Sequence, residues 1–388
     1  MNKEILKSKF IEKFSNKDDL RFYFSPGRIN LIGEHIDYNG GLVFPCAISL
    51  GTSAVLSPRN DEKVNLYSEG ISVKGIDTFN LNNTLVKENN WVDYVKGVVS
   101  EIKNLGFVLK KGFDVYVYGN LPRGASVSSS ASLELLFAEI IRDLNNLEIT
   151  DLELVKVCQR AENNFVGLRC GIMDQFAIGM SKKDHAILLD CASIKYEYVP
   201  LELKDNVILI MNTNKSRKLV TSKYNERCDE CANGLSIIQN NYKKVNFLCE
   251  LEENDLPIIK EIIKDETVYK RVHHVVSEMS RVKKTYTALN EGNLVLVGEL
   301  LNASHKSLKE DYEVTGLELD TIVELAQQVP GVLGARMIGA GFAGCAIAIV
   351  KKDAVESVKE KVSKEYKNII GYDCDILVAE TNDRTKRI

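Results

Sequence analysis

The stretch that decides the fold is PGRINLIGEHIDYNGG, residues 26–41. Its glycines disfavour a stable helix and its charges disfavour a buried strand, so the sequence predicts a loop. The carboxylates of Glu34 and Asp37 accept hydrogen bonds, and the imidazole of His35 can donate or accept. Such a loop can bind several hydroxyl groups of one sugar. An ordinary turn between two strands explains this segment equally well when it is taken alone.

A second motif, GNLPRGASVSSSASLELL, spans residues 119–136. Apolar residues at helical spacing follow its serines, so a helix is expected to begin near Ser129 to Ser132. The first N–H groups of that helix lack partners within the helix, and its dipole favours an anion, so a phosphate is the natural ligand. A serine cap on the helix would explain one serine but does not require three in a row.

The second motif also matches the spacing of a phosphate-binding P-loop, G-x-x-x-x-G-x-S, over residues 119–126. Ala125 occupies the position of the lysine that reaches the β and γ phosphates, so this interpretation fails. Charge neutralisation must then come from a metal ion and a distant cation, for which Arg28 is a candidate.

A third motif, GARMIGAGFAGC, spans residues 334–345 and includes G-x-G-x-x-G at 339–344. A dinucleotide-binding fingerprint should open a helix, whereas residues 345–350 form a short apolar run typical of a strand. The motif is better interpreted as a glycine loop that packs closely against a ligand or against the first motif.

Together the three motifs resemble the galactokinase branch of the GHMP small-molecule kinase superfamily. Segments 91–98, 170–176 and 222–227 are also similar to that branch, in the same order. The resemblance implies an α+β, two-domain GHMP kinase fold. It places an N-terminal mixed-sheet domain at residues 1–200, a C-terminal α/β domain at 201–388, and the active site between them.

The resemblance also implies the site residues. Asp174 would be the catalytic base that faces the anomeric hydroxyl, and Arg28 beside it would keep that carboxylate ionised and stabilise the transferring phosphoryl group. The sugar-contacting positions are Glu34, His35, Asp37 and Tyr224. The ATP-contacting positions are Ser68, Gly124, Ala125, Ser126, Val127, Ser128, Ser129 and Ser130, with Trp91 also near the adenine. Ser130 and Glu162 would bind Mg²⁺, which prefers oxygen ligands.

Without the resemblance, these residues have plainer interpretations. Glu162 would be a solvated helix carboxylate, Asp174 one half of a structural salt bridge, and Tyr224 a core residue. Residues 170–176 are largely apolar, and an unpaired carboxylate is costly in such surroundings.

The implied reaction transfers phosphate directly from ATP to D-galactose, giving ADP and galactose 1-phosphate. An aspartate carboxylate is a weak base for a sugar hydroxyl, so proton transfer should accompany or follow P–O bond formation. Orientation and charge stabilisation would supply most of the acceleration. Two alternatives stay open: a kinase for N-acetylgalactosamine, galacturonate or arabinose, and a non-catalytic sensor that binds galactose and ATP.

Four positions depart from the family pattern: Ser126, Val127, Ile338 and Ala343. Ser126 and Ala343 stand where glycine is usual, and a positive φ at either would cost about 1–2 kcal/mol. Ile338 removes a hydroxyl donor from the glycine loop. A sensor would arise from damage to the phosphate loop, and the intact serine run argues against it.

Composition is consistent with this function. The 388 residues suffice for two domains, and the net charge of −4 gives no indication of nucleic-acid binding. Nine scattered cysteines suit a reducing compartment, and Cys228-x-x-Cys231 lacks the partners of a zinc site. No segment has the apolar length of a signal peptide or a membrane span, so we expect a cytoplasmic protein without membrane partners. A monomer is also expected.

Periodicity predicts mixed secondary structure. The N-terminal segment should be an amphipathic helix with an apolar stripe of Ile5, Leu6, Phe10 and Phe14. Other predicted helices span 91–105, 131–147, 151–165, 218–239 and 317–328, and predicted strands span 42–56, 112–118, 185–189, 207–211 and 345–350.

Overall fold

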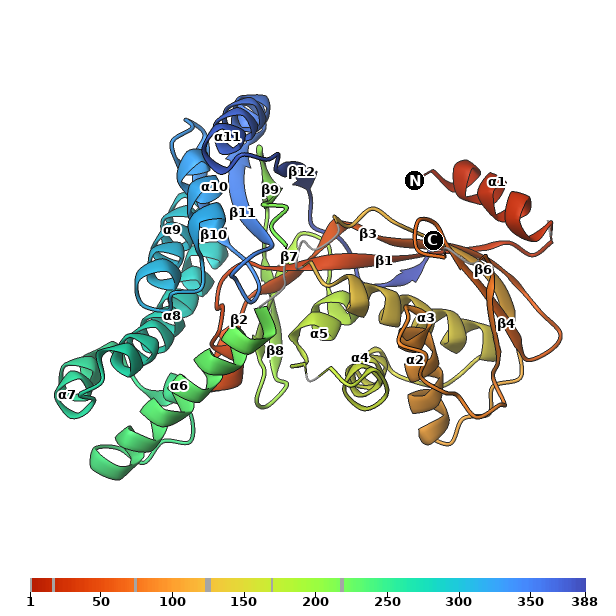
Figure 1. Cartoon of the computed structure of the whole chain (residues 1–388), viewed down its shortest axis with the longest axis horizontal. Coiled ribbons are helices and arrows are strands. Elements are labelled where there is room, and N and C mark those ends of the chain that lie inside the picture. Colours follow the sequence, from red (N-terminus) through yellow and green to blue (C-terminus); the bar gives the residue numbers. More distant parts are fainter. Residues whose placement is uncertain (1, 16–17, 73–74, 123–126, 169, 217–219) are drawn as a thin grey trace.

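The computed structural model describes residues 2–15, 18–72, 75–122, 127–168, 170–216 and 220–388. Figure 1 shows two halves: α2 to α5 lie beneath the long strands β1 and β3, and α6 to α11 lie on the other side of the molecule. This arrangement and the mixed sheet confirm the predicted two-domain fold. The proposed boundary near residue 200 falls between β8 and β9 and stays a prediction.

The N-terminal half is built on a mixed sheet of order β13-β1-β3-β6-β4-β5, in which only β4 and β6 pair in parallel among the described strands. Its strands are β1 (Arg21–Asn30), β3 (Pro45–Pro58), β4 (Lys63–Ser68), β5 (Asp77–Asn80), β6 (Phe113–Gly119) and β13 (Lys386–Arg387). Its helices are α1 (Lys3–Phe14), α2 (Val92–Asn104), α3 (Ser129–Asn145), α4 (Asp151–Arg160) and α5 (Met173–Met180). A smaller sheet, of order β2-β7-β8, contains β2 (Leu42–Val43), β7 (His185–Asp190) and β8 (Tyr196–Pro200).

The C-terminal half contains an antiparallel sheet of order β10-β11-β9-β12. The strands are β9 (Asn206–Asn212), β10 (Val332–Met337), β11 (Cys345–Lys351) and β12 (Asp375–Ala379). The helices are α6 (Val220–Asn241), α7 (Leu256–Ile262), α8 (Glu266–Asn290), α9 (Leu294–Glu310), α10 (Leu317–Gln327) and α11 (Val355–Ile370). Short 3-10 turns span Asp37–Asn39, Leu248–Glu250, Glu253–Asp255 and Lys352–Ala354.

Apolar packing joins the halves, because one buried cluster contains residues from both. Ile29, Ile36 and Phe44 of the first motif region pack in the same cluster as Val272 and Ile347. Buried apolar side chains also fix α1, since Leu6 and Phe10 pack with residues of β3 and β6, whereas Ile5 is 50% exposed. The predicted amphipathic helix is therefore confirmed, with Ile5 outside its buried stripe.

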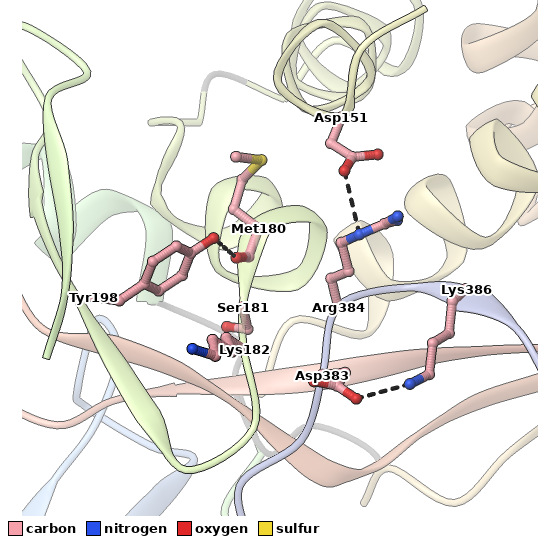
Figure 2. A pocket seen from close by; sticks show the side chains of 8 residues that line it. All are labelled: Asp151, Met180, Ser181, Lys182, Tyr198, Asp383, Arg384 and Lys386. Carbon is pink, nitrogen blue, oxygen red and sulfur yellow. Dashed lines mark hydrogen bonds and ion pairs between the residues drawn. The ribbon is translucent and has the colours of Figure 1, made fainter. Parts of the chain in front are cut away.

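The C-terminal segment returns to the N-terminal half, where β13 pairs with β1. Figure 2 shows how its side chains hold it beside an open hollow of about 360 Å³. Arg384 Nε lies 3.2 Å from Asp151 Oδ2, and Lys386 Nζ lies 2.7 Å from Asp383 Oδ2. The contact of Arg384 with Asp151 fastens the C-terminal segment to α4, whereas the contact of Lys386 with Asp383 lies within that segment. None of the predicted site residues lines this hollow.

Most predicted elements are confirmed to within two residues, with two corrections. The predicted strand 42–56 is two strands, β2 and β3, which belong to different sheets. The predicted helix 151–165 is α-helical only to Arg160 and continues as a π-helical turn over Ala161–Val166.

The prediction of a loop for residues 26–41 is wrong for its first part. Residues 26–30 belong to β1, where Arg28 is only 6% exposed. A charge is tolerated there because Asp174 pairs with the guanidinium, and Asn30 is satisfied by hydrogen bonds to Glu34 and Phe44. The loop proper begins at Leu31.

Candidate functional site

An ion pair between Arg28 and Asp174 lies at the centre of the candidate site. Arg28 comes from β1 and Asp174 from the first turn of α5, and two guanidinium nitrogens donate to the two carboxylate oxygens at 2.9 Å each. The Arg28 side chain is 7% exposed, whereas that of Asp174 is 31% exposed. Such a bidentate contact fixes the carboxylate in orientation while leaving part of it accessible to a substrate.

Ser128 connects this pair to the start of α3. Its hydroxyl donates to Asp174, and its backbone has a φ of +59°. Ser128 occupies the cap position of α3 but makes no side-chain hydrogen bond to the helix. The helix begins at Ser129, as predicted, and its first N–H groups are not capped by this serine. A simple serine cap therefore does not account for the motif.

A polar pocket of about 250 Å³ opens beside the ion pair. The residues that line it are Arg28, Glu34, His35, Asp37, Cys170, Gly171, Met173, Asp174, Tyr224, Gly339 and Ala340. All four sugar-contacting positions and both catalytic positions expected from the sequence are among them. Two residues of the glycine loop complete the wall, so the first and third motifs meet here.

Glu34 links the first motif to the glycine loop. Its Oε1 accepts from the N–H of Gly339 at 2.7 Å and lies 3.2 Å from Nη2 of Arg336. Its other oxygen accepts from Asn30 at 2.7 Å. The charge of this buried carboxylate is thus matched by a fully buried arginine, and one oxygen anchors the loop.

His35 contacts the next residue of the same loop. Its Nε2 lies 3.2 Å from the carbonyl oxygen of Ala340, and its Nδ1 lies 2.9 Å from the hydroxyl of Tyr38. Burial lowers the pKa of His35 to about 3, so the ring is neutral. Its backbone adopts a φ of +64°, a costly conformation stabilised by the bond from Asn39 to the His35 carbonyl oxygen.

Asp37 and Tyr224 complete the polar wall. Burial, and then the charge of Glu34, raise the pKa of Asp37 to about 6. Burial also raises the pKa of Tyr224, so its phenol keeps its proton and can donate. The Tyr224 ring lies 5.6 Å from that of His35. The pocket therefore offers carboxylate acceptors and neutral donors in a small volume, as recognition of hydroxyl groups requires.

A second pocket, of about 270 Å³, lies over the start of α3. Its lining is more apolar and consists of Thr52, Ser68, Glu69, Ile71, Trp91, Tyr94, Val117, Gly119, Leu121, Pro122, Ser129, Ser130 and Leu133. Both positions expected near the adenine, Ser68 and Trp91, are present. Because residues 128–130 reach from this pocket to Asp174, the two pockets adjoin at the N-terminus of α3.

Glu162, on the π-helical turn after α4, contacts Ser130 of the second pocket and Cys170 of the polar pocket. It is 7% exposed, and its hydrogen-bond partners among the described residues are neutral: Gln175, Cys170 and Ser130. Burial, and then the charge of Asp174, raise the pKa of Glu162. A buried carboxylate without a described cationic partner, next to a serine hydroxyl, is the kind of oxygen pair that fits Mg²⁺.

The remaining expected positions belong to the phosphate-loop segment and to the glycine loop. Gly124, Ala125 and Ser126 lie outside the described residues. Val127 is buried in the core, and its carbonyl oxygen accepts from the N–H of Arg28 at 3.2 Å. Ala343 does not have a positive φ, which Phe342 adopts instead, so the strain considered for Ala343 does not arise. Ile338 packs in the core and bonds to Cys345 through its backbone.

Sequence reasoning missed three buried polar residues that shape the site: Arg336, Gln175 and Glu134. Arg336 could have been noticed as a single charge within the apolar strand β10. Gln175 donates to Glu162 at 2.7 Å and to Glu134 at 3.1 Å, so its amide bridges two carboxyl groups. Burial, and then the charge of Glu162, raise the pKa of Glu134 well above its usual range.

Family models match along most of the chain. Residues 8–58 match the galactokinase galactose-binding signature, residues 93–182 the N-terminal domain of GHMP kinases, and residues 285–368 their C-terminal domain. The first match contains Arg28, Glu34, His35 and Asp37, and the second contains Glu162 and Asp174.

Relatives and solved structures agree with these models. Over the full length of both chains, the sequence is 51% identical to a galactokinase of Lactiplantibacillus plantarum. It is 48% identical to a galactokinase of Clostridium beijerinckii, covering 100% of this chain and 99% of the relative. The crystal structure of Lactococcus lactis galactokinase with galactose superposes with a TM-score of 0.92 at 46% identity, covering 99% of each chain. A mevalonate kinase of Methanococcus jannaschii, at 19% identity and TM-score 0.68, covering 95% of this chain and 100% of its own, shares the fold. On these grounds the chain belongs to the galactokinase family of GHMP kinases.

Proposed function

We propose that this chain transfers the γ-phosphoryl group of ATP directly to the anomeric hydroxyl of D-galactose, giving galactose 1-phosphate and ADP. One observation carries the proposal: the Arg28–Asp174 pair lies in the polar pocket and is hydrogen-bonded to Ser128, at the helix start that also borders the second pocket. A sugar in the first pocket and a nucleotide in the second would meet at this pair.

The pair is suited to phosphoryl transfer. Asp174, fixed in orientation by Arg28 and Ser128, would accept the proton of the sugar hydroxyl as the P–O bond forms. Arg28 is nearly buried, so its charge is weakly screened where negative charge develops on the phosphoryl oxygens. The N-terminus of α3 adds partial positive charge on the nucleotide side. Positioning and electrostatic stabilisation would therefore provide most of the catalysis.

Ser130 and Glu162 would hold Mg²⁺. This pair is smaller than a cluster of three or more His, Cys, Asp or Glu, and the described residues contain no such cluster arranged to hold a metal. Two protein oxygens fit an ion that usually takes its remaining ligands from phosphates and water. When bound, Mg²⁺ neutralises phosphate charge. Gln175 would keep Glu162 oriented through its 2.7 Å hydrogen bond.

Release of ADP tests the proposal. The chain is incubated with ATP, Mg²⁺ and, separately, galactose, N-acetylgalactosamine, galacturonate, arabinose and glucose. Turnover confined largely to galactose and abolished by EDTA is expected. Turnover on another sugar alone would reassign the substrate, and galactose binding without ADP release would make the chain a sensor.

Compartment and assembly are part of the same proposal. All nine cysteines are free thiols, which is typical of proteins of the reducing cytoplasm. No helix in the described part of the chain has the length and apolar character needed to span a membrane. The expected assembly is a monomer, and light scattering of the purified protein checks this.

A further inference from the structure

Behind the polar pocket, four polar side chains form a continuous chain of hydrogen bonds that ends at the glycine loop. Cys231 Sγ lies 3.0 Å from the hydroxyl of Tyr312, which lies 2.8 Å from the hydroxyl of Tyr38. The Tyr38 hydroxyl lies 2.9 Å from Nδ1 of His35, and Nε2 of His35 lies 3.2 Å from the Ala340 carbonyl oxygen. Of these residues, only His35 and Ala340 line the pocket.

The carbonyl oxygen of Ala340 determines which group donates in every hydrogen bond of this chain. A carbonyl oxygen can only accept, so Nε2 of the neutral His35 carries the proton and Nδ1 must accept. Tyr38 therefore donates its single hydroxyl proton to His35. Tyr312 must then donate to Tyr38, and the thiol of Cys231 must donate to Tyr312. Each hydroxyl both donates and accepts, and such aligned chains strengthen their members.

The chain of hydrogen bonds joins four parts of the sequence that are distant from one another. His35 and Tyr38 belong to the first motif, Cys231 to α6, Tyr312 to the segment after α9, and Ala340 to the glycine loop. Tyr312 and Cys231 are buried, at 0% and 2% exposure. The rings of His35 and Tyr312 also pack together, with centroids 4.9 Å apart. The buried hydroxyls and the ring contact with Tyr312 therefore hold the imidazole of His35 in one position.

The next residue towards the N-terminus acts on the same loop. Glu34 accepts from the N–H of Gly339, while His35 donates to the carbonyl oxygen of Ala340. Two consecutive side chains therefore hold two consecutive residues of the glycine loop, and all four line the pocket. The carboxylate is fixed by Arg336, whereas the other nitrogen of the imidazole is fixed by the hydroxyl of Tyr38.

We propose that Tyr38 and Tyr312 are positioning residues for sugar binding: with Cys231 they hold His35 as an Nε2–H donor and, through Ala340, hold the wall of the sugar pocket. They act through His35 and do not line the pocket themselves. The inference rests on the sugar-binding role proposed above for this pocket.

The proposal predicts that loss of these hydroxyls changes the KM for galactose and not the KM for ATP. Removing the Tyr38 hydroxyl leaves Nδ1 of His35 buried without a donor and frees the ring to turn. Loss of one neutral buried hydrogen bond corresponds to roughly a 3- to 10-fold change in binding. We therefore expect Tyr38→Phe to raise the KM for galactose by about that factor. The KM for ATP and kcat should stay within about twofold, because the nucleotide pocket and the Arg28–Asp174 pair are untouched.

Tyr312→Phe is the second variant, and it should change the galactose KM in the same direction but less, because Tyr38 keeps its bond to His35. Tyr366→Phe is the matched control. Tyr366 is also fully buried, and its hydroxyl donates to the Thr213 carbonyl oxygen at 2.8 Å, far from the chain of bonds. It should lose stability without any change in the galactose KM.

Nitrogen-15 spectroscopy of the imidazoles gives a readout that needs no sugar. The chain has five histidines, so the ring signals are few, and His35→Asn identifies those of His35. In the unmodified chain Nε2 should be protonated and Nδ1 should accept a hydrogen bond. In Tyr38→Phe the Nδ1 signal should move to the position of an unbonded ring nitrogen.

The proposal is overturned if Tyr38→Phe leaves the Nδ1 signal unmoved, if its galactose KM stays within twofold, or if its ATP KM rises equally. If Tyr38→Phe does not fold, Tyr312→Phe decides by the same two KM values, and an unchanged galactose KM there overturns the proposal. Failure of the proposed function would be visible separately, as absence of galactose turnover in the unmodified chain.

Discussion

Replacing Arg28 by methionine tests the proposed chemistry while keeping most of the side-chain volume. The change removes both hydrogen bonds to Asp174 and a nearly buried positive charge beside the polar pocket. Losing one donor that stabilises transition-state charge typically lowers kcat by a factor on the order of 10²–10³. We expect a loss of that size, with a much smaller change in the KM for galactose.

Stability should fall as well, but moderately. Removing one partner of a fully buried ion pair costs about 3–5 kcal/mol. Asp174 keeps the bond from Ser128, and its side chain is 31% exposed, so water can partly replace the guanidinium. We therefore expect a loss of about 2 kcal/mol in the free energy of unfolding.

The assay is steady-state ADP release with galactose and ATP varied in turn, together with urea unfolding. Arg28→Lys should recover part of kcat, because it restores the charge but not the bidentate contact. The control is Arg59→Met, which removes an arginine that pairs with Asp61 and Asp114 away from both pockets. It should lose stability only. A folded Arg28→Met protein with kcat within threefold of the unmodified chain would refute the role of Arg28.

Three further predictions follow from other parts of the structure. The pKa of Asp37 is raised to about 6, so its carboxylate is protonated, and no longer a charged acceptor, below that pH. The KM for galactose should therefore rise roughly 10-fold from pH 7 to pH 5. Asp37→Asn should flatten this pH profile of the KM. Gln175→Leu removes one of the donors that orient Glu162, so the Mg²⁺ concentration for half-maximal activity should rise about 10-fold, and Mn²⁺ binding should weaken in parallel. Deleting residues 381–388 removes β13 and the Arg384 contact, so the free energy of unfolding should fall by about 2 kcal/mol in a urea titration.

Each of these three predictions has an outcome that would contradict it. A pH profile of the galactose KM that is the same with aspartate or asparagine at position 37 would remove that residue from sugar recognition. Unchanged metal dependence in Gln175→Leu would mean that the amide is only structural. A truncated chain as stable as the full one would show that the pairing of β13 and the ion pair between Arg384 and Asp151 in Figure 2 contribute nothing to stability.

The sequence was most informative where chemistry is carried by consecutive residues. The serine run predicted that a helix begins near Ser129 to Ser132, and α3 begins at Ser129. The apolar run after the glycine loop, which forms β11, argued against a dinucleotide-binding motif, because such a motif should open a helix. The sequence was misleading at Arg28, where a charge inside a strand is acceptable only because a residue 146 positions away pairs with it. Periodicity cannot show such a partner.

The remaining site residues depend on tertiary contacts in the same way. Gln175 is next to Asp174 in the sequence, yet its role follows only from the approach of Glu134 and Glu162, which come from α3 and the π-helical turn. Tyr38 and Tyr312 look like ordinary aromatic residues until the fold brings their hydroxyls within 2.8 Å. Local patterns predict elements and loops, whereas buried polar contacts between distant segments require the fold.

The most direct test of the proposed mechanism is the Asp174→Ala variant, measured for turnover and for galactose binding in the same preparation. Asp174 contributes one wall of the polar pocket, while Glu34, His35, Asp37 and Tyr224 remain. We expect that ADP release is lost while galactose still binds in a calorimetric titration. Undiminished turnover with galactose would contradict the assignment of Asp174 and with it the proposed mechanism.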